Sequence, residues 1–144
     1  MFIDRTLKQV LLHYASKFAV IAVVGPRQAG KTTLTKEVFA NYRYFSLEDP
    51  DTLEAVRSDP RGFLERDYGT PVLIIDEFQN EPTLLSYMQG IVDSNYRPGY
   101  FILTGSQNFL MNQAITQSLA GRVALLTLLP LTADELQKSA LLPE

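Results

Sequence analysis

Residues 25 to 32 limit the choice of folds for this chain more sharply than any other segment. They read Gly-Pro-Arg-Gln-Ala-Gly-Lys-Thr and fit the pattern G-x-x-x-x-G-K-[S/T]. An apolar run, residues 18–24, stands directly before them, and a segment with helical character, residues 31–40, begins at their end. A glycine-rich turn between a buried strand and a helix directs successive backbone N–H groups at one point, which suits a phosphate group.

Each residue of this loop has an expected part in holding a nucleotide. Lys31 should reach the β- and γ-phosphates of ATP, Thr32 should place its hydroxyl on Mg²⁺, and Thr33 should lie near the α-phosphate. The predicted nucleotide-binding residues are therefore Gly25, Pro26, Arg27, Gln28, Ala29, Gly30, Lys31, Thr32 and Thr33. The alternative is a glycine loop that fits the pattern by chance. Average residue frequencies make such a match rare, well below about one in a hundred chains of this length.

A second part of the site is expected at the end of a later apolar strand. Residues 72–75 read Val-Leu-Ile-Ile and are followed by Asp76 and Glu77. In open α/β sheets, ligands bind at the carboxyl ends of the strands. We assign Asp76 to the Mg²⁺ shell, directly or through water, and Glu77 to orienting the attacking water. Taken alone, the two carboxylates would equally fit a solvated strand end, but the phosphate loop favours the site.

Glu77 also separates the reaction classes that a phosphate loop serves. A kinase for a small molecule must exclude water, whereas hydrolysis needs a group that positions water, so Glu77 favours an ATPase. The sequence contains no Asn-Lys-x-Asp segment of the kind that reads guanine, so a GTPase is not expected.

Three further residues complete the predicted catalytic set. Thr104 or Ser106, which follow the apolar run 100–103, would hydrogen-bond the γ-phosphate or the attacking water, although either hydroxyl would equally cap the next helix. Arg122 would stabilise transition-state charge in its own or a neighbouring subunit, or form only a surface ion pair. The predicted catalytic residues are Glu77, Lys31, Arg122, Ser106 and Thr104, and the predicted metal ligands are Thr32 and Asp76.

Five apolar runs alternate with helical or turn-rich stretches along the chain. The expected strands cover residues 18–24, 42–47, 72–75, 100–103 and 123–128. Helices are expected over residues 3–18 and 31–40, with further starts at Asp49-Pro50, Asp59-Pro60, Glu81-Pro82 and Thr132. This alternation predicts an α/β fold of the P-loop NTPase kind, a three-layer α/β/α sandwich around a five-stranded parallel sheet. A single domain over residues 1–144 is expected.

Net charge, cysteine content and the first residues limit the partners, metal sites and location that we expect. The 13 Lys and Arg against 16 Asp and Glu give a net charge of −3, so charge does not indicate nucleic acid as a partner, although it leaves such a partner open. The absence of Cys excludes thiolate metal sites. The first residues lack the unbroken apolar stretch of a signal peptide or a membrane span, so we expect a cytoplasmic protein that does not enter the membrane.

The ordered set of motifs resembles prokaryotic ATPases of the AAA+ superfamily that read GPRQ-x-GKTT, LED, IDE-x-Q, LTGS and LAGR. The matching segments here are residues 25–33, 47–49, 75–79, 103–106 and 119–122. The resemblance implies a five-stranded AAA+ core in which Thr104 or Ser106 takes the sensor position. It also implies that Arg122 is an arginine finger offered to a neighbouring subunit, and therefore a homo-oligomer. Members of the family continue into a helical lid and a further domain, and we expect this chain to be a truncated core without them.

Two functions follow from these expectations. The first is the binding and hydrolysis of Mg-ATP, with ATP and ADP as the ligands and Mg²⁺ as the cofactor; Glu77 and Arg122 favour it. The alternative is a nucleotide-binding fragment that does not hydrolyse ATP, or a module that docks a partner, which the expected lack of a lid favours. A phosphotransferase would need an acceptor pocket that the sequence does not indicate.

Overall fold

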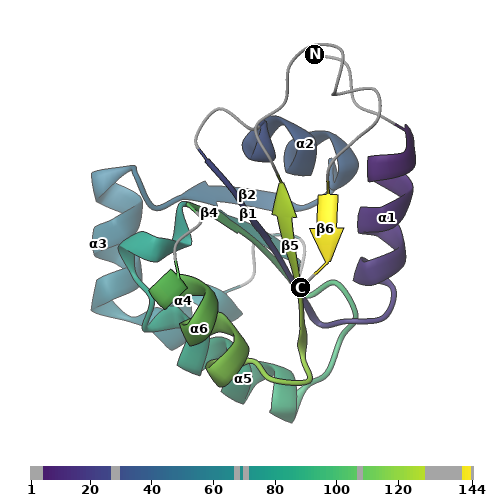
Figure 1. Ribbon diagram of the computed structural model, residues 1–144. Helices are drawn as coiled ribbons and strands as arrows, with labels where there is room; N and C mark the ends of the chain where they lie inside the picture. The colour runs from purple at the N-terminus through teal and green to yellow at the C-terminus, as the bar shows by residue number, and fades with distance from the viewer. Residues whose placement is uncertain are drawn as a thin grey trace.

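The chain folds around one mixed sheet with helices on both faces (Figure 1). The computed structural model describes residues 5–26, 30–66, 69, 72–106, 109–128 and 141–143. The strands of the sheet lie in the order β2-β3-β4-β1-β5-β6. Their bounds are β1 Val20–Val24, β2 Arg43–Ser46, β3 Leu73–Asp76, β4 Phe101–Gly105, β5 Val123–Leu128 and β6 Leu141–Pro143.

Strands β1 to β5 are all parallel, so the predicted α/β fold with a five-stranded parallel sheet is confirmed. The sixth strand was not predicted. β6 pairs antiparallel with β5, with Leu126 opposite Pro143 and Leu128 opposite Leu141. β1 occupies the middle of the sheet between β4 and β5, and all five of its residues are buried. This burial on both faces explains its unbroken apolar sequence.

The start of β1 is one place where the sequence-based boundary was wrong. The apolar run suggested a strand from residue 18, but β1 begins at Val20. The backbone N–H of Phe18 instead donates to the carbonyl of Tyr14 at 2.8 Å, which continues the turn that ends the first helix. The half-buried Phe18 ring packs with Tyr14 against the core. Phe18 is therefore apolar because it packs at the end of the first helix, and not because it belongs to β1.

The helices of the structure are α1 Arg5–Ala15, α2 Lys31–Val38, α3 Pro50–Ser58, α4 Pro60–Glu65, α5 Leu84–Ser94 and α6 Phe109–Ser118, with a short 3-10 turn, η2, at Phe78–Asn80. Two predicted helix starts are confirmed by their caps. Asp49 accepts a hydrogen bond from the backbone of Thr52, and Asp59 accepts one from the backbone of Gly62. A proline follows each aspartate, where a backbone N–H would have no helical partner. The helix expected from Thr132 lies outside the described residues.

Successive side chains of each strand point to opposite faces of the sheet, and the core therefore consists of two clusters. Side chains on one face pack with α3, α4, α5 and α6, and those on the other pack with α1 and α2 (Figure 1). On β3, Leu73 and Ile75 belong to the first cluster and Ile74 to the second. Because side chains two residues apart share a face, Asp76 is directed to the α1/α2 side. None of the helices in the described part of the chain is both long and apolar enough to span a lipid bilayer.

Candidate functional site

The glycine loop begins where the ends of three strands meet. The backbone N–H of Gly25 donates to the carbonyl of Gly105 at 3.1 Å, which ties the loop to the end of β4. A Cβ on Gly25 would collide with the carbonyl oxygen of Leu128 at the end of β5, so only glycine fits here without a shift. Gly30, with φ 84°, adopts the left-handed conformation directly before α2. The structure thus explains both glycines of the motif.

Part of the predicted loop lies outside the described residues. Arg27, Gln28 and Ala29 belong to that part, so their expected contacts with nucleotide stay predictions. Pro26 is described and exposed, and its carbonyl accepts a hydrogen bond from Lys31 Nζ at 3.2 Å. Lys31 is the first residue of α2 and only 3% exposed. Its amine therefore reaches back to the start of the loop.

A hydrogen bond between side chains joins α2 to β3 at this site. The hydroxyl of Thr32 donates to Asp76 Oδ2 at 3.0 Å, although 44 residues separate the two along the chain. Thr104, fully buried at the end of the neighbouring β4, donates to the other carboxylate oxygen of Asp76. Thr33 lies one residue further into α2 and is half-buried. The structure thus brings Thr32, Asp76 and Thr104 together. The sequence predicted Thr32 and Asp76 for one site, but it predicted Thr104 for the γ-phosphate or the attacking water.

Tyr44, which lies in the expected strand of residues 42–47 and was not predicted for the site, also reaches this carboxylate. Tyr44, on β2, donates its phenolic hydroxyl to Asp76 Oδ2 at 2.5 Å. Burial, followed by the hydrogen bond to Asp76, raises the pKa of Tyr44, so the phenol stays protonated and remains a donor at neutral pH. A buried carboxylate needs such donors, because an ion without partners in the interior is costly. Asp76, 5% exposed, has three hydroxyl donors.

These oxygen groups fit a small divalent cation. The Thr32 hydroxyl and the Asp76 carboxylate are hard oxygen donors within 3.0 Å of each other, and Mg²⁺ is held in proteins by one or two such groups together with phosphate oxygens and water. Among the described residues, no cluster of three or more His, Cys, Asp or Glu side chains suits a metal ion. The chemistry of the donor pair therefore matches a cation that shares its shell with a phosphate.

Glu77 adopts a backbone conformation that side chains rarely take. Its φ of 57° and ψ of 45° lie in the left-handed region, and it is the one residue other than glycine with positive φ in the described chain. Such a conformation costs on the order of 1 kcal/mol or more and is found where the surroundings hold it. The chain turns at Glu77 between β3 and η2, and Glu77 is buried, with 6% exposed.

Gln79 connects Glu77 to the end of β4. The Gln79 amide nitrogen donates to Glu77 Oε2 at 2.5 Å and lies 3.4 Å from the hydroxyl of Ser106. The backbone N–H of Ser106 donates in return to the amide oxygen of Gln79 at 3.3 Å. Ser106 is thus near the acidic pair, as expected, but through Gln79. No role was predicted for Gln79, although it closes the IDE-x-Q motif of the family that the sequence resembles.

Arg122 lies at the amino ends of the parallel strands, opposite the end that carries the glycine loop. It directly precedes β5, and Val123, the first residue of β5, pairs with Val20, the first residue of β1. The glycine loop instead follows Val24, the last residue of β1. A strand of five residues separates its two ends by roughly 15 Å. Arg122 makes a two-pronged ion pair with Asp93, with Nε–Oδ1 at 2.6 Å and Nη2–Oδ2 at 2.9 Å. A role for Arg122 at the phosphates of its own chain is therefore not supported.

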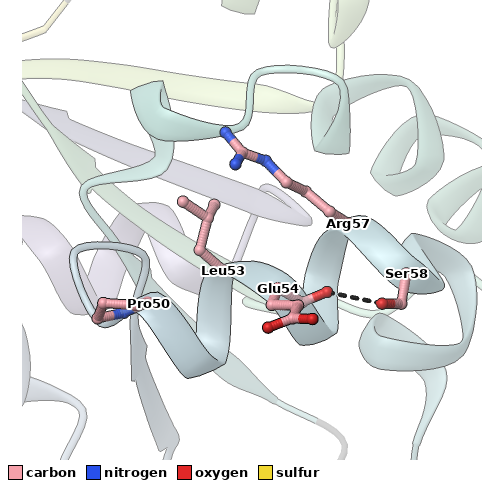
Figure 2. A pocket seen from close by; sticks show the side chains of 5 residues that line it. All are labelled: Pro50, Leu53, Glu54, Arg57 and Ser58. Carbon is pink, nitrogen blue, oxygen red and sulfur yellow. Dashed lines mark hydrogen bonds between the residues drawn. The ribbon is translucent and has the colours of Figure 1, made fainter.

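A surface pocket elsewhere on the molecule lacks the features of a reaction site. Its volume is about 470 Å³, and its lining comes from one helix, α3: Pro50, Leu53, Glu54, Arg57 and Ser58 (Figure 2). Two of its polar lining residues already have partners, since Ser58 donates to the Glu54 carbonyl and Arg57 pairs with Glu81. No residue predicted for the site lines this pocket.

Comparison with known proteins places the chain in a domain family. Residues 17–137 match a family model described as an AAA domain. An uncharacterized protein of Mycobacterium tuberculosis is 34% identical over 122 residues, which cover 84% of this chain but 27% of that protein. The chain thus spans about a quarter of the length of the curated relatives it matches.

Two solved structures share the fold at low identity. A Walker-type ATPase of Pyrococcus abyssi has a TM-score of 0.57 at 14% identity, covering 93% of this chain and 55% of that one. A DNA replication initiation factor has a TM-score of 0.55 at 17% identity, covering 85% of this chain and 44% of that one. At these identities the likeness concerns the fold alone.

Proposed function

The chain belongs to the AAA domain family, and on this premise we propose that it binds Mg-ATP and hydrolyses it. One observation carries the proposal. Lys31, the Thr32–Asp76 pair and Glu77 lie at one edge of the sheet, at the carboxyl ends of the strands. This edge is where parallel α/β sheets bind their ligands.

The phosphate loop supplies the groups that would hold the nucleotide. Residues 25–32 would act as a Walker A motif, with the backbone N–H groups at the start of α2 facing the phosphates. The Lys31 amine, which donates to the Pro26 carbonyl within the loop, would turn to the β- and γ-phosphates. Thr33 would lie near the α-phosphate.

Thr32 and Asp76 would hold the Mg²⁺ ion, with Asp76 as the acidic residue of a Walker B motif. Bound there, the ion would neutralise charge on the β- and γ-phosphate oxygens. Because Thr104 donates to the Asp76 oxygen that Thr32 does not use, Thr104 serves the cation site through Asp76. This contact supports Ser106, and not Thr104, as the hydroxyl that meets the γ-phosphate.

Glu77 would orient the attacking water. Its carboxylate is held by the Gln79 amide, which leaves one of its two oxygens to accept a proton from water. We expect Glu77→Gln to keep nucleotide binding and to abolish turnover, because the amide retains the shape of the side chain without its basicity. Unchanged hydrolysis in Glu77→Gln would remove Glu77 from the mechanism.

Arg122 would act in a neighbouring subunit of a homo-oligomer. The two-pronged pair with Asp93 would have to open when Arg122 meets a phosphate of the next chain. The same pair favours the alternative function, a nucleotide-binding module without turnover, in which Arg122 only ties β5 to α5. The two functions therefore differ in what Arg122 does.

Phosphate release from Mg-ATP, measured over a range of protein concentrations, tests the proposal. We expect specific activity to rise with concentration as subunits associate and share Arg122, and Lys31→Ala to release no phosphate. Nucleotide binding without phosphate release at any concentration would favour the module, and no nucleotide binding would refute both functions.

A further inference from the structure

Tyr44 lies beside the carboxylate proposed to bind Mg²⁺, and a lysine lies over its ring. β2 pairs with β3, with Tyr44 opposite Ile74 and Ser46 opposite Asp76. The phenol reaches two residues along the neighbouring strand and donates to Asp76 Oδ2. Lys36, one turn after Thr32 on α2, places its amine 3.9 Å from the centre of the Tyr44 ring. One helix thus contacts both the carboxylate and the phenol.

The three hydroxyls around Asp76 divide its two oxygens unequally. Thr104 donates to Oδ1, whereas Thr32 and Tyr44 both donate to Oδ2. A carboxylate held through both oxygens cannot rotate about the bond that joins it to its Cβ. The hydrogen bond from Tyr44 therefore limits the orientation of the group that would face the cation.

Tyr42 shows what an ordinary tyrosine of this strand region does. It lies two residues before Tyr44 and packs against the same core cluster. Its hydroxyl donates to the backbone carbonyl of Gly99 at 2.8 Å, which ties the chain before β2 to the turn before β4. The two phenols thus differ in their partners, a neutral carbonyl for one and a buried carboxylate for the other.

We propose that Tyr44 is a positioning residue for the divalent cation, which fixes the Asp76 carboxylate through its hydroxyl and is itself held by Lys36. The inference rests on the proposed function, because it takes Asp76 as the cation ligand. Groups that hydrogen-bond a ligating side chain govern metal affinity without touching the metal, and their loss costs about 10- to 100-fold in affinity. Tyr44 acts in this way, since it hydrogen-bonds Asp76 and does not itself bind the cation.

The binding of a fluorescent ADP analogue tests the inference apart from turnover. The dissociation constant is measured with Mg²⁺ and with EDTA, and the value in EDTA divided by the value in Mg²⁺ gives the contribution of the cation. We expect Tyr44→Phe to reduce this ratio by about tenfold and to leave binding in EDTA unchanged. Tyr42→Phe, which also loses one phenolic hydrogen bond, should keep the wild-type ratio. Melting temperatures of both variants report any general loss of stability.

The outcomes separate the inference from the proposed function. A wild-type ratio in Tyr44→Phe, with Mg²⁺-dependent binding intact in the parent protein, overturns the inference and leaves the proposed function standing. Absence of nucleotide binding by the parent protein overturns both. If Tyr44→Phe does not fold, Lys36→Gln decides, since Lys36 is exposed on α2. A reduced ratio in Lys36→Gln supports the role of Tyr44, and an unchanged ratio overturns it.

Discussion

The hydroxyl of Thr32 lies 3.0 Å from Asp76 Oδ2 and joins the first turn of α2 to the last residue of β3. This contact provides a link between the phosphate loop and the acidic strand end, two segments that the sequence places 44 residues apart. It can form because Asp76 points to the face of the sheet that α2 covers. The alternation of side chains along β3 therefore places Asp76, the proposed cation ligand, on the face that α2 covers, whereas Glu77 follows the end of the strand.

We predict that Thr32→Ala weakens the Mg²⁺ dependence of ATP turnover and lowers the stability of the fold. The change removes a proposed cation ligand and one of three donors to a buried carboxylate, a loss of about 1–3 kcal/mol in the free energy of unfolding. Thr32→Ser keeps the hydroxyl and should retain most of both properties. Turnover against Mg²⁺ concentration and urea unfolding measure the two effects.

Thr33→Ala is the matched control for that change. Thr33 is the next residue of α2 and is half-buried like Thr32, but it is not a proposed cation ligand. It should leave the Mg²⁺ dependence close to wild type. If Thr32→Ala and Thr33→Ala have the same Mg²⁺ dependence, Thr32 is not a cation ligand.

Gln79→Leu should lower the turnover number and leave the apparent affinity for ATP unchanged. Leu has a similar size but no amide, so Glu77 loses the group that donates to its Oε2, and Ser106 loses the acceptor of its backbone N–H. We expect a fall of about tenfold or more in turnover, since a catalytic carboxylate needs a fixed orientation. Steady-state kinetics separates the two constants.

Gln117→Leu provides the control, because Gln117 is an exposed residue of α6 that is not part of the proposed site. It should have wild-type kinetics. A Gln79→Leu protein with a wild-type turnover number would show that Glu77 keeps its orientation through its backbone alone.

Gly105→Ala should destabilise the protein by about 1–3 kcal/mol, as overpacked core positions do. An added Cβ would lie 2.5 Å from the Gln79 amide oxygen and 2.8 Å from the Phe78 ring, which is fully buried. Gly90→Ala in α5 should instead stabilise by roughly 0.5–1 kcal/mol, since its Cβ meets only the flexible end of Arg61 at 3.4 Å. Urea unfolding of both variants compares them, and equal stabilities would show that the end of β4 can shift.

Local sequence signals predicted the features that depend on neighbouring residues. The strand before the glycine loop and the capped helix starts at Asp49 and Asp59 follow from a few adjacent residues. The closeness of Asp76 to Thr32 was also predictable, because the carboxyl ends of parallel strands meet at one edge.

Contacts that depend on strand order were not predictable in this way. Tyr44 reaches Asp76 only because β2 is the neighbour of β3, and nothing in the sequence of β2 distinguishes its tyrosine from a core residue. β6 has three residues and forms a strand because it pairs with β5. The partner of Arg122 likewise comes from α5, 29 residues away.

The Arg122–Asp93 pair gives a prediction that separates a structural role from a catalytic one. The hydrogen bond from the Arg122 guanidinium lowers the pKa of the Asp93 carboxyl below its ordinary value of 3.8. A lowered pKa means that the pair stabilises the fold above that ordinary value and that this contribution disappears as the pH falls through the lowered pKa. Arg122→Ala should return the pKa of Asp93 to its ordinary value, as measured by NMR titration of the carboxyl carbon.

Turnover in the same variant then shows which role Arg122 has. If Arg122 serves a neighbouring subunit, Arg122→Ala should abolish the concentration-dependent part of phosphate release while nucleotide binding persists. Asp93→Asn breaks the same ion pair but keeps the arginine, so it should retain that activity. Equal loss of activity in Arg122→Ala and Asp93→Asn would mean that the ion pair is needed only to hold β5 against α5, and that the arginine itself does not reach a phosphate.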